Sequence, residues 1–386
     1  MKVVLNKDEI QAAIDSSQRE ALAYFGRDEI YMERYLTKPR HVEVQVLCDQ
    51  HGNAVYLGTR DCSAQRRHQK LIEEAPAFDI PESILKSMGE AAVAVAKGCD
   101  YVNAGTVEFL YENEEFYYLE MNTRLQVEHP VTEMVTGVDL VEQQLRVAFG
   151  EELSIRQEDV EIAGHAIEVR INAEDPAEGK FLPSPGRLLT FKASAGFGTR
   201  WDGGYEEGDE ISQFYDNLVG KLICWGKDRK TAIARTIRAL EEFEIAGLST
   251  TIPADLAILR HPDFQENKHS TKWVEEELDL TGVKGSPLEN TEAGSGSVIR
   301  TTEVEVDGKR FSVSMSVPSG KSQIRRSASA TGASASGGDG KITVPMQGTI
   351  VKIQVAVGET VQSGDILLVL EAMKMENNIA SDVDGI

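Results

Sequence analysis

The stretch EFLYENEEFYYLEMNTRLQVEH covers residues 108–129 and alternates apolar and polar side chains on both sides of a short acidic segment. A period of two is typical of β-strands, and the acidic segment Asn113–Glu115 is predicted to be the turn of a hairpin. With that turn, Glu112 pairs with Phe116. Glu108 then lies opposite Glu120. If the second strand stays extended, one of its faces carries a row of polar side chains: Glu120, Asn122, Arg124, Gln126 and Glu128.

The residue types in this row indicate chemistry on a charged ligand. Two carboxylates directly opposite each other repel, unless a cation lies between them. Glu108, Glu120 and Asn122 supply oxygen ligands that suit Mg²⁺ or Mn²⁺, and they are predicted to hold such an ion. The guanidinium of Arg124 matches a planar oxyanion, and Glu128 is suited to take a proton from it. The alternative from periodicity alone is an exposed strand face covered by ion pairs.

The composition is that of an ordinary globular protein, with 386 residues, 41% hydrophobic and 27% charged. A chain of this length is expected to form two or three domains. The net charge of −23 disfavours binding to nucleic acid or to an anionic membrane, because the average field of the chain repels phosphates. The four cysteines form no C-x-x-C pair, and no apolar run suits a signal peptide or a membrane span, so a cytoplasmic protein is predicted.

Periodicity predicts a larger α+β part followed by a small all-β part. Helices are predicted at 6–26, 83–98, 228–247 and 252–261, with Gly247 stopping the third. Strands are predicted at 41–47, 54–60 and 165–172, with hairpins at 105–122 and 302–317. Residues 327–341 are rich in Gly, Ser and Ala, as in a flexible tether, and the chain ends in short strands.

The last strands contain EAMKM, residues 371–375, in which two methionines flank Lys374. The triplet falls near a predicted hairpin tip, where two exposed Met side chains make sense as a soft recognition surface. A lysine that projects from such a tip suits acylation, which turns its ammonium group into an amide. An ordinary surface lysine in a turn is the alternative.

Two longer strings resemble known families. EAMKMEN (371–377), preceded by PMQGTIVKIQVAVGETVQSGD (345–365), resembles the biotin attachment site of biotin carrier domains. A lipoyl domain is the rival carrier, but it usually has Asp before the lysine and Ala after it. EMNTRLQVEHPVTEMVTG (120–137) resembles the ATP-grasp active site of biotin carboxylases. The resemblance implies that a biotin protein ligase attaches biotin to Lys374.

The resemblance to biotin carboxylases also implies a metal site, a bicarbonate site and a base. The implied metal ligands are Glu108, Glu120 and Asn122. The implied bicarbonate contacts are Arg124, Gln126 and the backbone of Val127, with Glu128 as the base that deprotonates bicarbonate and Arg124 also as the catalytic arginine.

Further segments match the same family: YMERYLTKPRHVEVQVL (31–47), RDCSAQRRHQKLIEEAPA (60–77), HAIEVRINAEDP (165–176) and FYDNLVGKLICWG (214–226). The first two imply ATP contacts from Glu33, Arg34, Leu36, His41, Gln65, His68 and Lys70. The third implies that Arg170 stabilises the enolate of biotin, since a fixed cation belongs where negative charge develops. A structural ion pair is the alternative for Arg170. The fourth makes Asp216 a supporting residue, whereas His129 is equally well a packed or capping histidine.

The implied reaction begins when Glu128 deprotonates bicarbonate, which attacks the γ-phosphate of Mg·ATP. The resulting carboxyphosphate gives CO₂ and phosphate, the phosphate removes the ureido proton of biotin, and the ring captures the CO₂. The arm on Lys374 then carries the carboxyl group to a separate carboxyltransferase (β) subunit, and acetyl-CoA or propionyl-CoA is the expected acceptor. A homo-oligomer of the biotin carboxylase part is also implied.

The match covers nearly all of residues 1–280 and 341–386, whereas the family pattern is longer at both ends. No glycine-rich loop that could cover ATP phosphates precedes the match. The chain is therefore expected to be a truncated form that lacks bicarbonate-dependent ATPase activity on its own. In the carrier part, a set of apolar side chains is expected to lack partners: Ile350, Ile353, Val355 and Leu368.

The expected domains are the C-terminal part of an ATP-grasp domain at 1–150, a biotin carboxylase C-terminal domain at 151–280, a linker with a hairpin at 281–340 and an incomplete biotinyl domain at 341–386. Two alternatives remain from the sequence. The chain could be an inert carrier or scaffold, or it could be another ATP-grasp ligase, such as a carbamoyl-phosphate or purine-pathway enzyme. The lysine motif and RLQVEHPVTE argue against the second.

Overall fold

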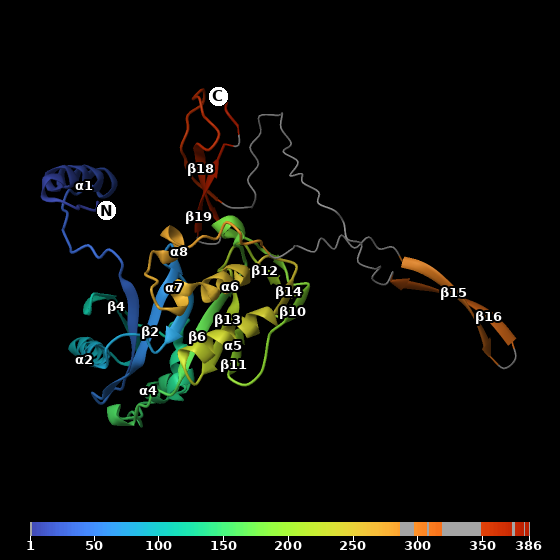
Figure 1. The fold of residues 1–386 in the computed structure, drawn as a ribbon, viewed down its shortest axis with the longest axis horizontal. Helices are drawn as coiled ribbons and strands as arrows, with labels where there is room; N and C mark the ends of the chain where they lie inside the picture. Colours follow the sequence, from blue (N-terminus) through green and yellow to red (C-terminus); the bar gives the residue numbers. More distant parts are fainter. Residues whose placement is uncertain are drawn as a thin grey trace.

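The computed structural model describes residues 2–285, 297–306, 309–318, 349–372, 375–381 and 383–385. At its centre lies an eight-stranded antiparallel sheet in the order β11-β13-β6-β3-β2-β1-β4-β5 (Figure 1). Its strands are β1 (Arg40–Cys48), β2 (Ala54–Arg66), β3 (Gln69–Ala75), β4 (Asn103–Glu112), β5 (Glu115–Asn122), β6 (His165–Asn172), β11 (Thr199–Gly203) and β13 (Leu218–Gly226). One sheet therefore contains strands from both sides of residue 150, and the α+β class is confirmed.

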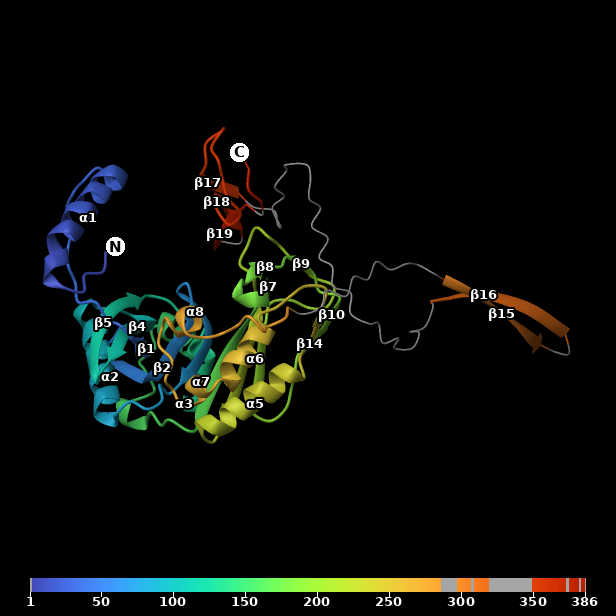
Figure 2. The same cartoon turned by 45° about the horizontal axis from the view of Figure 1, so that its top comes forward.

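Helices cover both faces of this sheet. On one face, α2 (Glu82–Gly98) packs against β1 and β2, and α5 (Arg229–Glu241) packs against β13 and β6, next to α6 (Ile252–Arg260) (Figure 2). On the other face, α3 (His129–Thr136) packs against β6, β2 and β13, and α4 (Leu140–Ala148) packs against β4. The region of this second face beside α3 is where the charged side chains described below converge.

Strand β1 shows how the alternation of side chains separates core from site. Its Val42, Val44 and Val46 are fully buried in the cluster beneath α2. The residues between them point to the opposite face, yet His41 and Glu43 are also buried, with exposed fractions of 7% and 0%. The polar face of this strand is therefore not a solvated surface, and its charged groups need partners within the protein.

The predicted end of one helix is wrong. Helix α5 ends at Glu241, six residues before Gly247, and Glu244–Ala246 forms strand β14, which pairs with β10 (Thr190–Lys192). Gly247 has a φ of +104°, and a Cβ atom there would lie 2.1 Å from the backbone oxygen of Arg187. This glycine is therefore required by a close approach of two backbone segments rather than by a helix end.

The remaining elements of residues 2–285 are short, apart from the first helix. They are η1 (Lys7–Glu9), α1 (Ile10–Phe25), η2 (Gln157–Asp159), β7 (Glu174–Asp175), η3 (Ala177–Gly179), β8 (Leu182–Pro183), β9 (Gly186–Arg187), β12 (Glu210–Ile211), α7 (Pro262–Gln265) and α8 (Trp273–Glu276). The predicted start and end of the first helix agree with Asn6, whose side chain accepts a hydrogen bond from Asp8, and with Gly26, which has a φ of 72°.

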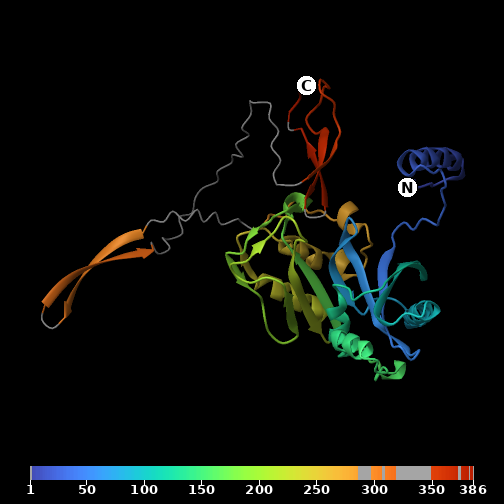
Figure 3. The same cartoon turned by 180° about the vertical axis from the view of Figure 1, so that it is seen from behind.

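The C-terminal part contains two further small sheets. Strands β15 (Ser297–Val306) and β16 (Lys309–Pro318) form the predicted hairpin and extend it at both ends (Figure 3). Strands β17 (Thr349–Ile353), β18 (Ile366–Ala372) and β19 (Met375–Ala380) form a three-stranded sheet in that order. Lys374 and the tether at 327–341 lie outside the described residues.

The apolar surface of the carrier part agrees in part with the expectation. Ile350 and Ile353 are exposed by 53% and 67%, whereas Val355 and Leu368 are only partly exposed. Among the described residues, no helix is both long and apolar enough to cross a membrane.

Candidate functional site

One row of charged side chains crosses four neighbouring strands on the face that carries α3. Arg60 of β2 pairs in register with Glu43 of β1, and Glu43 pairs with Glu108 of β4. Glu108 in turn pairs with Glu120 of β5. Three carboxylates therefore stand side by side, an arrangement that requires positive charge or hydrogen-bond donors nearby.

The hairpin that carries two of these carboxylates has a tighter turn than predicted. Two turn residues with positive φ connect β4 and β5, so Glu112 pairs with Glu115, and the predicted pair of Glu112 with Phe116 is wrong. A bulge next to Glu108 shifts the register by one residue. The predicted pair of Glu108 with Glu120 is therefore confirmed.

The chain does not stay extended past this hairpin. Strand β5 ends at Asn122, and the residues that follow form an irregular segment up to Glu128, which directly precedes α3. The prediction of one long extended face is wrong at this point. The side chains of Arg124 and Gln126 nevertheless line the same cavity as Glu128, because the segment folds back over the sheet toward α3.

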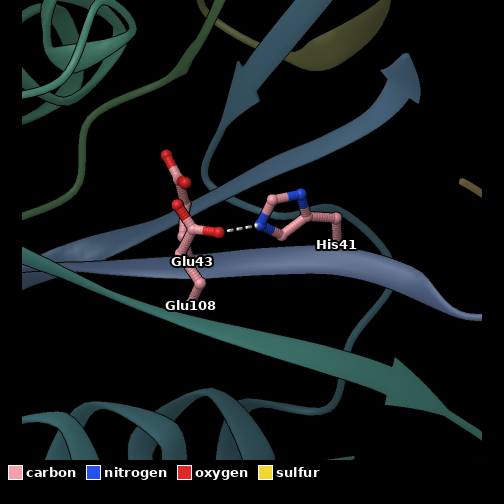
Figure 4. Close-up of side chains that lie close together, drawn as sticks. All are labelled: His41, Glu43 and Glu108. Atoms are coloured by element: carbon pink, nitrogen blue, oxygen red, sulfur yellow. Dashed lines mark hydrogen bonds and ion pairs between the residues drawn. The ribbon is translucent and has the colours of Figure 1, made fainter. Parts of the chain in front are cut away.

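Glu108 is the most contacted carboxylate of the row. Its Oε2 lies 2.9 Å from Nε2 of His41, in a group that also includes Glu43 (Figure 4). Its Oε1 accepts hydrogen bonds from Gln126 at 2.7 Å and from Asn122 at 3.1 Å. Burial alone would raise the pKa of Glu108, but the contact with His41 and the charge of Lys70 lower it to about 2.

Two cations compensate the buried Glu43. Arg60, which is fully buried, contacts Glu43 Oε1 through its Nε, and Lys70 Nζ lies 2.8 Å from Glu43 Oε2. The other guanidinium nitrogens of Arg60 donate to Gln45, Thr106, Gln126 and Thr132 at 2.7–3.0 Å. Burial opposes the ionised form of Glu43, but Arg60 and Lys70 hold its pKa well below the ordinary value.

Glu128 is held between two cations at the floor of the site. One of its carboxylate oxygens contacts Lys70, and the other accepts a hydrogen bond from Nη2 of Arg170 at 2.7 Å. Arg170 is anchored on its far side, because its Nε donates to Glu73 at 2.6 Å. Lys221 donates to the backbone oxygen of Val127 and so fixes the segment just before Glu128. This geometry gives a carboxylate that faces the cavity with two positive charges beside it.

The cavity brings together nearly every side chain that the sequence indicated. It is lined by all the predicted metal, bicarbonate, ATP and catalytic residues outside the carrier: Glu33, Arg34, Leu36, His41, Gln65, His68, Lys70, Glu108, Glu120, Asn122, Arg124, Gln126, Val127, Glu128 and Arg170. Asp216 lines it as well. His129 does not line it, and its Nδ1 lies 2.7 Å from the backbone oxygen of Gln126, which agrees with a packed histidine.

The segments predicted to contact a nucleotide approach this cavity from two sides. Arg34 belongs to the extended segment before β1, where it contacts Glu115 at 3.2 Å and lies over the ring of Tyr117. His68 lies in the turn between β2 and β3 with a φ of 62°. A left-handed backbone at a non-glycine residue is strained and is often retained at ligand-binding positions.

Among the described residues, oxygen ligands that suit a hard divalent cation gather at one end of the cavity. The amide of Asn122 bridges the two carboxylates, with Nδ2 lying 3.1 Å from Glu108 and 3.0 Å from Glu120. The two carboxylates offer hard oxygen ligands, and the Oδ1 of Asn122, which accepts from Arg124 here, would be the third after rotation of the amide. The neighbouring group of His41, Glu43 and Glu108 fits a cation less well, since Arg60 and Lys70 already neutralise Glu43. Glu108, Glu120 and Asn122 are therefore the better metal ligands.

Sequence reasoning missed the charges beneath the cavity. Glu43, Arg60, Glu73 and Lys221 were assigned no role, yet each contacts a predicted site residue or holds the chain beside one. A signal was present for Glu43, which stands between Val42 and Val44, whereas Arg60 and Glu73 each have a charged neighbour and show no such alternation. Single strands do not reveal which charge on another strand each one meets.

Three family models together match most of the chain. They are the carbamoyl-phosphate synthase L chain ATP binding domain at residues 1–156, the biotin carboxylase C-terminal domain at 168–276 and the biotin-requiring enzyme domain at 340–386. The whole chain is 45% identical, over 409 residues, to a biotin-dependent acyl-coenzyme A carboxylase alpha3 subunit of Mycobacterium leprae. It is 36% identical, over 494 residues, to a propionyl-CoA carboxylase alpha chain of Ruegeria pomeroyi.

Solved structures extend the likeness to the fold. The biotin carboxylase domain of a thermophilic 2-oxoglutarate carboxylase, solved with bicarbonate, superposes with a TM-score of 0.68 at 44% identity, covering 70% of this chain and 61% of that one. The chain spans 67% of the length of the M. leprae relative and 72% of the R. pomeroyi relative. It spans between 56% and 62% of several biotin carboxylase and pyruvate carboxylase subunits that it also matches.

Replacement of Arg60 by Met is expected to lower the free energy of unfolding by about 3–5 kcal/mol, because Glu43 and Gln126 lose a fully buried partner. The matched control is Arg124→Met, which removes an exposed guanidinium that lines the cavity and is expected to change stability by less than about 0.5 kcal/mol. Urea unfolding followed by circular dichroism measures both. Equal effects of the two substitutions would show that the buried charges are not what holds this face together.

Proposed function

This chain belongs to the family of biotin carboxylases and biotin-dependent acyl-CoA carboxylase alpha subunits, and we propose that it serves the ATP- and bicarbonate-dependent carboxylation of biotin carried on Lys374. The observation that supports this most directly is Glu128, which faces the cavity between Lys70 and Arg170. A base in that position can take a proton from an acid bound beside it, and the two cations lie where negative charge then develops.

Bicarbonate fits the segment between Asn122 and Glu128. In the proposal, the exposed guanidinium of Arg124 meets two oxygens of the anion, and the side chain of Gln126 and the backbone of Val127 orient it. Glu128 then takes its proton. Once Glu128 is neutral, its attraction for Lys70 and Arg170 falls, and both charges become available to the phosphate and to the anion that forms on the acceptor ring.

Glu108, Glu120 and Asn122 would hold Mg²⁺ or Mn²⁺, which neutralises the phosphate charge of a bound nucleotide. Lys70, close to Glu108 in this cavity, supports contacts to the phosphates from the same side. The ATP contacts proposed for the rest of the nucleotide are Glu33, Arg34, Leu36, His41, Gln65 and His68, all of which line the cavity.

Arg170 is proposed to stabilise the deprotonated ring of biotin, whose ureido nitrogen accepts the carboxyl group. Its side chain suits this role because Glu73 fixes one edge of the guanidinium while Nη2 reaches Glu128 on the cavity side. Asp216, which also lines the cavity, is proposed as a supporting residue.

The carrier, the domain division and the partners follow from the same family. We propose an ATP-grasp part at 1–150, a biotin carboxylase C-terminal domain at 151–280, a linker at 281–340 and a biotinyl domain at 341–386. A biotin protein ligase would load Lys374, a carboxyltransferase subunit would accept the carboxyl group for an acyl-CoA, acetyl-CoA or propionyl-CoA, and the carboxylase parts would associate with one another. The reaction is proposed to take place in the cytoplasm.

The double substitution Glu108→Gln and Glu120→Gln is expected to weaken the Mg²⁺-dependent binding of ADP by at least about tenfold, because two anionic ligands of the ion become neutral. Calorimetric titration of ADP with and without Mg²⁺ measures this. Glu114→Gln, in the exposed turn of the same hairpin, is the matched control and is expected to bind as the wild type does. Mg²⁺-dependent binding that survives the double substitution would rule out this metal site.

Co-expression with a biotin protein ligase is expected to label the wild-type chain and not the Lys374→Arg variant in a streptavidin blot. Lys352→Arg, which changes an exposed lysine on β17 of the same carrier sheet, is the control that should keep the label. Label on the Lys374→Arg variant, or none on the wild type, would contradict the proposed attachment site.

A further inference from the structure

The carboxyl groups of Glu73 and Glu168 lie on neighbouring strands beneath Arg170, and of the two only Glu73 pairs with Arg170. Glu73 of β3 pairs in register with Glu168 of β6, and both residues are fully buried. Three of their four carboxylate oxygens, Oε2 of Glu73 and both oxygens of Glu168, have no hydrogen-bond partner among the residues that the structure describes. Two ionised carboxylates in this position would repel each other and leave acceptors unsatisfied.

The charges around this pair do not balance if every group is ionised. Arg170 is the cation shared by Glu73 and Glu128, and Glu168 has no ion pair among the described residues. With Glu73 and Glu168 both ionised, two adjacent buried carboxylates would depend on the one guanidinium of Arg170, and a single bound proton removes this excess charge. Burying an uncompensated charge is unfavourable, so the singly protonated pair is the stable state.

We propose that Glu73 and Glu168 hold one proton between them, with the carboxyl of Glu168 donating to Glu73, and that this pair positions Arg170. The charge belongs on Glu73, because its other oxygen accepts the hydrogen bond from Nε of Arg170. The proton belongs on Glu168, which has no such partner. With this proton, one oxygen of Glu168 donates a hydrogen bond to an oxygen of Glu73, so acceptors on both residues gain a partner. The positioning half of this inference rests on the function proposed for Arg170.

The surroundings of the pair agree with this assignment. Burial and the charge of Glu73 raise the pKa of Glu168 well above its ordinary value, and burial raises the pKa of Glu73 although Arg170 opposes the rise. The titratable and charged groups that act on the pair from the surrounding elements are Cys62 on β2, Lys70 on β3, Arg170 on β6, Lys221 on β13, Asp255 on α6 and Glu128 just before α3. Of these, Lys221 also lies 4.0 Å from Asp202, which Arg200 contacts.

The pair acts on the site through one chain of contacts. Glu168 keeps Glu73 singly charged, Glu73 holds Nε of Arg170, and Arg170 presents Nη2 to Glu128. If Glu168 were ionised, a second negative charge would compete for Arg170 and draw it away from the cavity. Glu168 is therefore a positioning residue that acts through Glu73.

The pH dependence of stability gives a direct test. The folded chain keeps the proton on Glu168, while the unfolded chain releases it above the ordinary pKa of 4.5, so raising the pH above that value favours unfolding. Glu168→Gln mimics the protonated acid and removes this term. Its thermal midpoint is expected to exceed that of the wild type by at least about 2 °C at pH 8, and the difference should shrink toward pH 5.

The neighbouring Glu74 is the matched control, because it is equally buried but is ionised beside Arg229 and His165. Glu74→Gln is expected to lower the midpoint at pH 8. If Glu168→Gln lowers it in the same way, Glu168 carries a charge in the folded protein and the inference fails.

Infrared difference spectra supply a readout that a merely structural role would not change. Difference spectra of wild type minus variant at pH 8 cancel the band of any other protonated acid, such as the buried Asp255, whose pKa burial raises well above its ordinary value. The band of one protonated carboxylic acid is expected in the difference spectra of both Glu168→Gln and Glu73→Gln, since removal of either partner ends the sharing. Absence of this band from either difference spectrum would overturn the proposal. Neither measurement uses nucleotide, bicarbonate or biotin, so a negative result here leaves the proposed function standing, and loss of that function leaves this result interpretable.

Discussion

A carboxylate inside a protein is stable only beside a cation or several hydrogen-bond donors, and this constraint organises the central sheet. The alternation of β1 sends its valines under α2 and its charged residues to the opposite face, where Glu43 meets Arg60 and Lys70. Lys70 then reaches Glu128, and Glu128 reaches Arg170. The same contacts that make the buried charges tolerable therefore fix the relative positions of the base and the cations around the cavity.

This arrangement couples stability to function. Each cation at the cavity floor has a protein partner, so the site is organised before any ligand arrives and little reorganisation is needed when negative charge appears. The metal end differs, because Glu120 and Arg124 are exposed and contact the amide of Asn122 rather than buried counter-charges. The charged groups at the floor of the cavity are thus already paired with one another. The exposed groups at its rim, Glu120 and Arg124, remain available to bind a cation and an anion.

The sequence predicted the hairpin and the facing of Glu108 and Glu120, because alternation within a strand is a local property, whereas the grouping of the other candidate residues came from the resemblance to biotin carboxylases. It failed where structure depends on partners distant in sequence. The turn register depended on a bulge, the extended face ended at Asn122 where the chain turns toward α3, and Gly247 was needed by the backbone of Arg187. Arg60 and Glu73 were missed because their partners lie on other strands, and the sequence of one strand does not reveal which residue of another strand it will contact.

In the proposed function, one face of this sheet holds a metal–nucleotide complex beside a base for bicarbonate. The most direct measurement is a crystal structure of the full chain grown with Mn²⁺, ADP and bicarbonate, with the ion located by its anomalous scattering. We expect the manganese peak in contact with the carboxylates of Glu108 and Glu120, with bicarbonate between Arg124 and Glu128. Manganese bound elsewhere, or bicarbonate out of hydrogen-bond reach of Glu128, would contradict it.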